Sequence, residues 1–245
     1  MTMCQADAMT LSRRIAAGAA AALFALPLAA CSNGDASSDQ TEMTPAQVMS
    51  RAKSILDETS GVELSLSTQD ERADGDFLKS AEGVITDAPA FQGVAGGRFL
   101  GFNAEDVEVR SVDGDFYINA PIVGWDVYDP AELCAPDPAT LLDPDLGVSN
   151  VLVAATDLVA SEPRRAADDN SVVVTPYAAT VPGTAVKTLL PCAPGESFEA
   201  VLAIDEDGRL RSADLTGEFF SGGSEVTYTI AITAYGVAQE ITAPE

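Results

Sequence analysis

Apolar and polar residues alternate with a period of two through much of the chain, and this alternation constrains the fold more than any other feature. Val62, Leu64 and Leu66 alternate with polar residues, and the pattern returns over residues 198–204 and 226–232. Successive side chains of a strand point to opposite faces, so the pattern predicts strands with one apolar and one solvent-facing side. Further short strands are expected at residues 78–85, 97–102, 106–112, 116–118, 172–174 and 210–215. Asp113-Gly114 indicates a tight hairpin, as an antiparallel meander requires.

Three segments carry the signals of helices instead. Thr44 and Gln47 form a capping box at the start of an apolar-periodic stretch, and Gly61 ends the predicted helix. Residues 149–160 are apolar on nearly all sides and predict a buried helix, whereas residues 182–190 predict a short amphipathic one. The sum is an α+β domain, with an antiparallel sheet and a few helices gathered on one side.

The N-terminal segment has the layout of a bacterial lipoprotein signal. Arg13 and Arg14 precede residues 15–30, which are uncharged and mostly Ala and Leu, and the segment ends at Leu28-Ala29-Ala30-Cys31. A basic region, a short apolar region and small residues before a cut are typical of a secretory signal. A cysteine directly after the cut can be joined to diacylglycerol, which makes this a lipobox with Cys31 as the lipidation site. The alternatives are an ordinary signal peptide or a short membrane helix, but the run falls short of the ~20 apolar residues that a spanning helix needs.

These signals predict the organisation of the chain. Residues 1–30 are a signal peptide that is removed, with either Met1 or Met9 as the start of translation. Residues 31–43 are a lipidated, polar and flexible tether. Residues 44–245 form a single domain of a size that buries a sizeable core. We therefore expect an exported protein, anchored by lipid in the outer leaflet of the plasma membrane.

Composition excludes several functions. The chain has a formal net charge of −25, so it would repel the phosphate backbone of a nucleic acid. It contains no histidine, which removes a Ser-His-Asp triad, a Cys-His pair and imidazole metal ligands. No phosphate-binding glycine motif and no calcium-loop spacing is present. We expect no catalytic residue, no metal and no cofactor; a hydrolase that uses two of the many carboxylates is a weak alternative to a non-enzymatic protein.

The cysteines have separate expected fates. Cys4 lies in the removed segment and Cys31 carries lipid, which leaves Cys134 and Cys192 in an exported and oxidising compartment. They form a natural disulfide, worth about 3–4 kcal/mol on the chain-entropy model. A catalytic thiol is the alternative, but it would need a histidine partner.

Several short motifs together resemble one family. The segment DPATLLDPDLGV at residues 137–148, VPGTAV at 181–186, the acidic hairpin at 205–210 and the ending at 234–244 occur in that order. With a helix soon after the lipobox, they resemble the LppX/LprA/LprF/LprG family of actinobacterial envelope lipoproteins. The resemblance covers essentially the whole mature chain. The Cys134–Cys192 pair cannot be assigned to the motifs of this family.

The resemblance implies a strongly bent antiparallel sheet, a half-barrel, with helices over its concave face and an apolar cavity between them. Such a cavity takes the acyl chains of lipids or glycolipids. The helices at 149–160 and 182–190 would form its lid and inward strand positions its floor. The expected lining residues are Val84, Phe99, Val109, Phe116, Ile118, Leu141, Leu142, Val148, Val151, Leu152, Ala155, Val174, Val186, Leu189, Leu202, Tyr228 and Ile230. Tyr177, Asn119 and Arg98 are expected to meet a headgroup at the rim.

The leading functional hypothesis is therefore a monomeric, membrane-anchored lipoprotein that carries acyl lipids or lipoglycans across the cell envelope. Its expected partners are the lipid itself, the plasma membrane through Cys31 and a lipid-exporting membrane transporter. The alternative is a surface lipoprotein without lipid cargo, which acts as an interaction or assembly module for an envelope transporter or enzyme. The two differ in whether the core is hollow or filled, and composition does not distinguish them.

Overall fold

The computed structural model describes residues 43–70, 75–99, 102–167 and 169–245, apart from the side chain of Phe99. These residues belong to one compact unit, residues 41–245. Cys31, the signal peptide and most of the tether lie outside the described residues.

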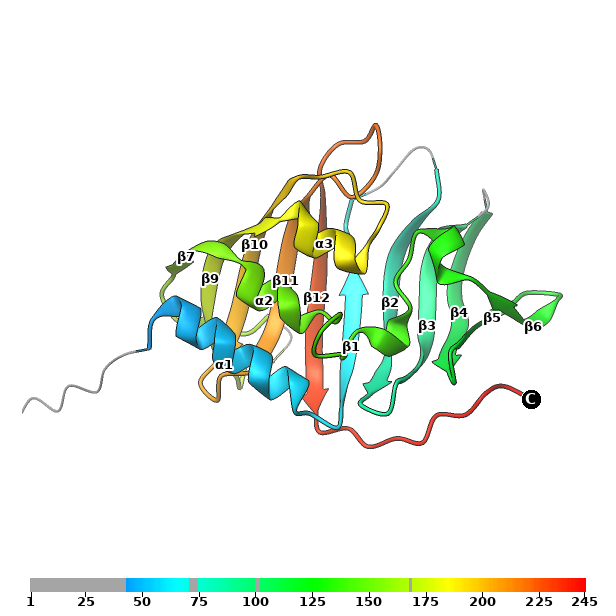
Figure 1. The fold of residues 1–245 in the computed structure, drawn as a ribbon, viewed down its shortest axis with the longest axis horizontal. Coiled ribbons are helices and arrows are strands. Elements are labelled where there is room, and N and C mark those ends of the chain that lie inside the picture. The colour runs from blue at the N-terminus through cyan, green and yellow to red at the C-terminus, as the bar shows by residue number, and fades with distance from the viewer. Residues whose placement is uncertain (1–42, 71–74, 100–101, 168) are drawn as a thin grey trace, which may run out of the picture. The chain divides into compact units, whose positions relative to one another are not determined.

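Within the described residues, twelve strands form one curved, open, antiparallel sheet (Figure 1). Eleven of them follow the order β6-β5-β4-β3-β2-β1-β12-β11-β10-β9-β7, and β8 pairs with β9. The first half comprises β1 (Gly61–Ser67), β2 (Phe77–Thr86), β3 (Ala90–Phe99), β4 (Phe102–Val112), β5 (Asp115–Ala120) and β6 (Gly124–Tyr128). The second comprises β7 (Thr156–Ala160), β8 (Arg164–Arg165), β9 (Val173–Pro182), β10 (Ser197–Asp205), β11 (Leu210–Gly217) and β12 (Val226–Tyr235).

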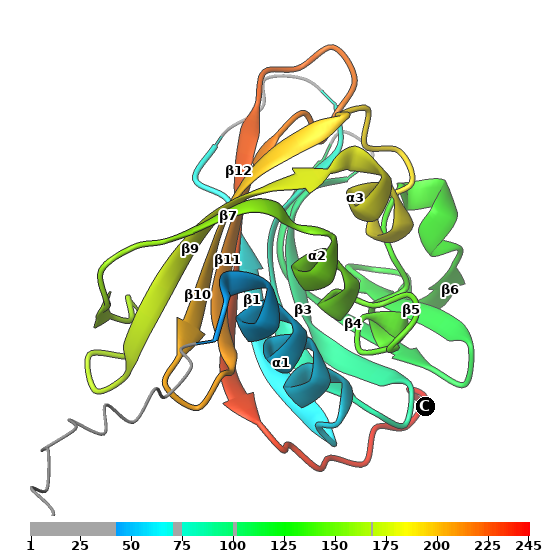
Figure 2. The same ribbon diagram turned by 60° about the vertical axis from the view of Figure 1, so that its left-hand side comes forward.

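The helices cover one face of the sheet, which is its concave face (Figure 2). They are α1 (Pro45–Asp57), α2 (Ser149–Ala154), α3 (Gly183–Leu189) and two 3₁₀ turns, η1 (Pro130–Leu133) and η2 (Pro138–Thr140). The predicted capping box is present, because Gln47 N donates to Thr44 Oγ1 while Thr44 N donates to Gln47 Oε1. Val48, Met49, Ala52 and Leu56 form the buried stripe of α1.

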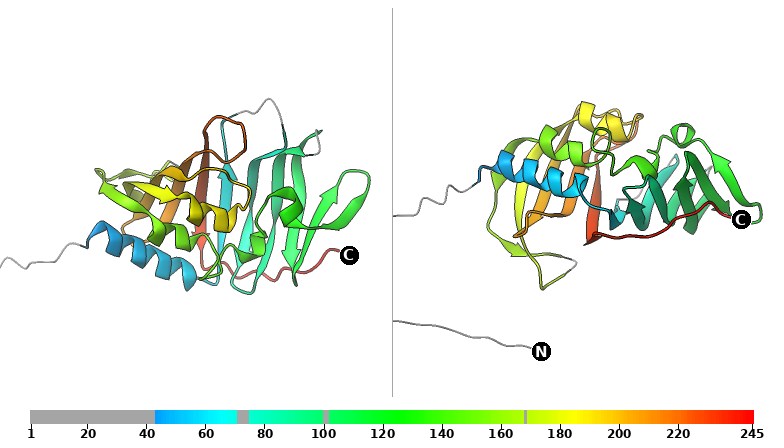
Figure 3. Two further views of the ribbon diagram at one scale, coloured as in Figure 1. Left: turned by 45° about the horizontal axis from the view of Figure 1, so that its top comes forward. Right: turned by 60° about the horizontal axis from the view of Figure 1, so that its bottom comes forward.

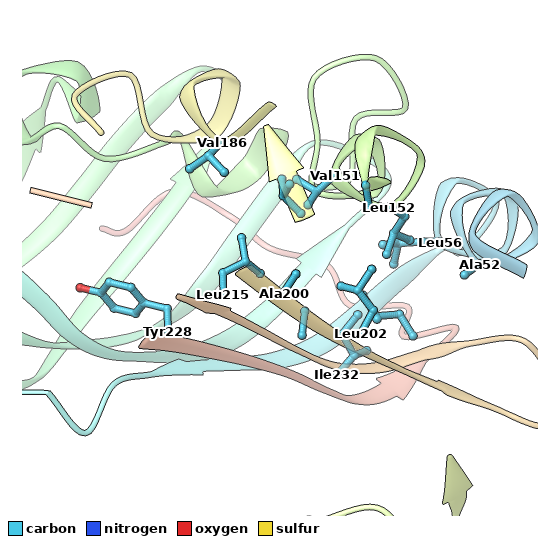
Figure 4. Close-up of a cluster of buried hydrophobic side chains, with 14 of the residues drawn as sticks. Ala52, Leu56, Val151, Leu152, Val186, Ala200, Leu202, Leu215, Tyr228 and Ile232 are labelled. Carbon is cyan, nitrogen blue, oxygen red and sulfur yellow. The ribbon is translucent and has the colours of Figure 1, made fainter. Parts of the chain in front are cut away.

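The main core lies between the helices and strands β9–β12. Phe198, Leu202 and Ile232 are buried on the concave face of these strands, as their alternation predicts. Leu56 of α1 and Leu152 of α2 face Leu202 and Ile232 across the core (Figure 4). This half of the sheet is therefore closed by packed side chains.

The C-terminal segment crosses the opposite, convex face (Figure 3). Ile241 packs there with Ala90 of β3 and Val112 of β4, and Arg110 Nη1 donates to Thr242 O at 3.0 Å. The chain thus has a second, small apolar cluster that the helices do not touch.

The structure corrects three sequence expectations. The segment 97–102 is not one strand, because β3 ends at Phe99 and β4 begins at Phe102. The helix expected at 149–160 stops at Ala154, and Thr156–Ala160 is strand β7, which pairs with β9. Strand β6 was not predicted, since Gly124–Tyr128 has little apolar alternation.

Candidate ligand-binding face

The concave face of β1–β5 differs from the closed half because its apolar side chains become progressively less buried along the strands. At one end, the cross-strand partners Val62, Ile85, Phe91, Ser111 and Phe116 are all buried. The turn η2 packs against β2, β3 and β4 and covers this end. The end near η2 is therefore sealed.

Further along the strands lies a row of five cross-strand partners that are all only half-buried. Ile230 of β12 pairs with Leu66 of β1, then follow Ala81 of β2, Ala95 of β3 and Val107 of β4. We call these five residues the half-open row. Each is apolar and lies on the helix-covered face, so the helices leave part of this face accessible.

Between the buried row and the half-open row, the concave face of the sheet carries very small residues. Gly83 of β2 pairs with Gly93 of β3, next to the Ala81–Ala95 pair. The ring of Phe91 lies against both glycines, since a Cβ on Gly83 or Gly93 would come within 2.7 or 2.6 Å of it. On the concave face, the centre of β2 and β3 thus carries no side chain larger than methyl apart from this one ring.

Aromatic side chains border the face on the side of β12. The Phe219 ring contacts the Tyr228 ring edge-on at 5.0 Å, and the Phe220 ring lies 6.4 Å from that of Tyr228. Tyr228 Oη donates to Leu78 O at 2.6 Å and so reaches across β1 to β2. Phe220 packs against the core while remaining partly exposed.

A disulfide joins two of the covering segments. Cys134 follows η1 and Cys192 follows α3, and their sulfurs are bonded with the Cα atoms 5.5 Å apart. The predicted pairing is therefore present. It ties the loop that contains η1 and η2 to the end of α3.

Aspartates of the Asp-Pro motif hold this loop on the sheet. Asp137 Oδ1 accepts bonds from Ser111 Oγ of β4 at 2.5 Å and from Ala139 N of η2 at 3.0 Å. Asp143 Oδ1 accepts from the amides of Asp145 and Leu146. These carboxylates thus cap turns, and the described residues contain no acidic or cysteine group of three that could hold a metal ion.

Lys53 performs a similar role between the helices. Its Nζ donates to Ser149 Oγ at 3.0 Å and to Pro144 O at 2.7 Å, and it forms an ion pair with Asp57. This cation fixes the start of α2 against α1.

The structure places most of the expected lining residues on the helix-covered side. Those in the main cluster or the half-open row are Val109, Phe116, Ile118, Leu141, Leu142, Val148, Val151, Leu152, Ala155, Val186, Leu189, Leu202, Tyr228 and Ile230. Two others lie on the convex face: Val84 pairs with Glu63, and Val174 packs with Ala166 and Ala203. The side chain of Phe99 lies outside the described residues.

The sequence did not lead us to the small inward residues of β2 and β3, and the residues expected to meet a headgroup lie on separate parts of the sheet. Ala81, Ala95, Leu66 and Val107 were not selected, although alternation with their polar neighbours was a signal for the inward face. The three expected headgroup residues do not come together. The pKa of the Tyr177 phenol on β9 is raised by burial, Asn119 donates to Glu108 on the convex face, and Arg98 pairs with Asn103 at the end of β3.

Two hollows are present at other places. One of about 500 Å³ lies on the convex face and is lined by polar and apolar groups in similar measure, with Glu63, Glu82, Glu108 and Arg110 among the charged ones. The other, of about 350 Å³, lies between η1, η2 and α3 and includes Pro136, Thr188 and Leu189. In the described part of the chain, we find no helix of the length and apolarity required for crossing a bilayer.

The fold is that of an open, strongly curved antiparallel sheet with helices on its concave face, and two solved structures share it. One is LprF from Mycobacterium bovis, with a TM-score of 0.65 and 14% sequence identity; the match covers 82% of this chain and 96% of LprF. The other is the Mycobacterium tuberculosis lipoprotein LppX, with a TM-score of 0.60 and 17% sequence identity; the match covers 81% of this chain and 98% of LppX. The LppX_LprAFG lipoprotein family model matches residues 44–243. The chain belongs to this family. No curated protein matches the sequence.

Proposed function

We propose that this protein is a membrane-anchored lipoprotein that binds acyl lipids or glycolipids on the concave face of β1–β5 and carries them across the cell envelope. The observation that carries the proposal is the half-open row, Ile230, Leu66, Ala81, Ala95 and Val107. Five apolar side chains stay half-buried there, whereas most apolar inward side chains of β9–β11 in the same sheet are buried.

The binding would rest on burial of hydrocarbon. Each CH₂ removed from water contributes about 0.8 kcal/mol, so an acyl chain gains affinity along its length without a specific polar partner. The proposal requires that the small side chains of Ala81 and Ala95 leave volume for such a chain on the concave face. The lipid on Cys31 would hold the domain at the membrane where cargo is collected.

Filling the floor tests this function. The substitution Ala95→Phe puts a ring into the half-open row, and Ala231→Phe puts the same ring on the opposite face, where Ala231 pairs with Ser65. We expect lipid extracted from Ala95→Phe, purified from its native envelope, to fall at least about tenfold by mass spectrometry, the loss expected for a displaced segment of two or more CH₂ groups. The control should retain wild-type lipid; equal lipid content in both variants would refute the proposal.

A second candidate function follows from the convex hollow. Its carboxylates and the Arg110–Trp125 stack, with Arg110 Cζ 5.3 Å from the ring centroid, suit a polar protein partner better than an acyl chain. This favours the assembly module as the alternative. It predicts that Glu82→Arg leaves lipid content unchanged and disrupts co-purification with an envelope transporter.

A further inference from the structure

Among the described residues, the most exposed large apolar side chains lie in the β5–β6 turn and at the start of β4. Ile122 and Val123, in the β5–β6 turn, have relative exposures of 106% and 72%. Phe102, the first residue of β4, has a relative exposure of 76%. Large apolar residues in such positions contribute nothing to the core.

Ile122 is also poorly suited to its own turn. Its φ is +83°, in the left-handed region where glycine or asparagine is preferred and where a β-branched residue is a clear outlier. Gly124, two residues later, has a φ of +82° and satisfies the same requirement without a side chain. Turn formation therefore does not explain an isoleucine at position 122.

Both turns lie at the same end of the sheet. The strands from β3 to β6 alternate in direction, so the start of β4, with Phe102, and the β5–β6 turn lie at the same end of the strands. The half-open row lies toward this same end. Ala95 is closer to the end of β3 than the buried Phe91 is, and Val107 is closer to the start of β4 than the buried Ser111 is. The accessible part of the concave face thus opens toward these turns.

We propose that the β5–β6 turn and Phe102 insert into the surface of a phospholipid bilayer while the domain exchanges lipid. The proposal rests on the proposed function, since the lipid on Cys31 supplies the bilayer. The segment from Cys31 to Thr44 spans at most about 45 Å, which would confine the domain to that surface at a high effective concentration.

Charge favours apolar insertion over electrostatic adsorption. The chain carries a net charge of −25, which opposes contact with anionic lipids, whereas residues 119–125 contain no charged residue. Trp125, the next residue after Gly124, is of the type that is enriched at the membrane interface. A short uncharged turn with two aliphatic tips and a tryptophan behind them fits a bilayer surface.

Trp125 gives a direct test, because it is the single tryptophan of the chain. The folded unit, residues 41–245, is mixed with vesicles of phosphatidylcholine that carry bromine on their acyl chains. We expect a blue shift of the Trp125 emission and quenching by the bromine. Unchanged emission at saturating vesicle concentration would overturn the proposal.

Three variants identify the inserting residues. Ile122→Asn suits the positive φ and should keep or raise the melting temperature, yet it should weaken vesicle binding roughly tenfold. Phe102→Ser should weaken binding similarly. Val159→Ser is the matched control, since Val159 of β7 has a relative exposure of 63% far from these turns, and it should bind vesicles as the wild type does. Equal binding by Ile122→Asn and Val159→Ser would contradict the proposal.

Two measurements separate this proposal from others. Binding of a fluorescent fatty acid without vesicles reports the concave face alone and should be unchanged in Ile122→Asn; if the fatty acid binds but vesicles do not, the membrane contact fails while the proposed function stands. Sedimentation of the wild type and Ile122→Asn tests whether the turns instead join two copies of the chain. A dimer that Ile122→Asn dissociates would overturn insertion.

Discussion

Tyr235 is a partly buried phenol whose surroundings strongly disfavour loss of its proton. Its Oη donates to Leu210 O at 2.7 Å, and Arg209 Cζ lies 5.8 Å from its ring centroid. Burial, followed by the charge of Asp205, raises the pKa of the Tyr235 phenol well above its ordinary value. The folded protein therefore keeps this proton at pH values where an unfolded chain releases it.

The protein should lose stability as the pH rises above about 10. The unfolded tyrosine ionises there while the folded one does not, so the free energy of unfolding falls by about 1.4 kcal/mol per pH unit from this residue. Chemical denaturation between pH 8 and 11 measures the slope. Tyr235→Phe should be about 1 kcal/mol less stable at neutral pH, because Leu210 O loses its donor, but its alkaline slope should be shallower. An equal slope in both proteins would assign the effect to another group, such as Tyr177, whose pKa burial also raises.

At the scale of elements, the disulfide between η1 and α3 unites two short segments that have few contacts of their own. The cysteines are separated by 58 positions in the sequence. The chain-entropy model gives about 4 kcal/mol for a loop of this length. The disulfide also holds together two of the segments that cover the concave face.

Removal of both thiols tests this contribution. Cys134→Ser/Cys192→Ser should reduce the free energy of unfolding by about 2–4 kcal/mol and leave the strands of the sheet in place. Thermal unfolding with and without a reductant makes the comparison: wild-type protein in reductant should match the double variant. If the reductant lowers the melting temperature of the double variant as well, its effect does not come from this disulfide.

The elements also show how far sequence reasoning reaches. Regular alternation correctly predicted β10 and β12, and the capping box correctly predicted α1. The prediction of a helix over residues 156–160 was wrong, because pairing with β9 overrides the helical pattern of this segment. Asp157 also takes a φ of +53°, which is not helical. Val84 and Val174 were assigned to the wrong face, since apolar residues also occur on the convex side, where the C-terminal segment and Ala166 cover part of it.

At the scale of the whole domain, the two halves of the sheet differ in how tightly their concave faces are packed. This difference was not predictable, because the accessible level depends on where η2 and α3 lie rather than on any one strand. The family resemblance predicted the curved antiparallel sheet, which is confirmed. The expected enclosed cavity stays a prediction.

The two halves should differ in local stability. Amide hydrogen exchange should be slow in β9–β11, whose apolar inward side chains are mostly buried, and faster in β2–β4, where the inward side chains around the half-open row are half-buried. Addition of a long-chain fatty acid should slow exchange in β2–β4 of the wild type and not of Ala95→Phe. Uniform exchange across both halves, with or without fatty acid, would contradict a ligand-responsive face.

The seam between β1 and β12 has a consequence for how the protein is made. These central strands join the first and last parts of the domain, with Leu66 opposite Ile230 and Val62 opposite Tyr235. Each half can form hairpins early, but the sheet cannot become continuous until nearly the last residue has been delivered. Pairing between strands so distant in sequence slows folding, because the entropy of closing the long loop is lost before the new contacts stabilise it. A newly synthesised chain thus stays open until its C-terminal strand is available, so any truncation before residue 226 leaves two half-sheets with exposed edges.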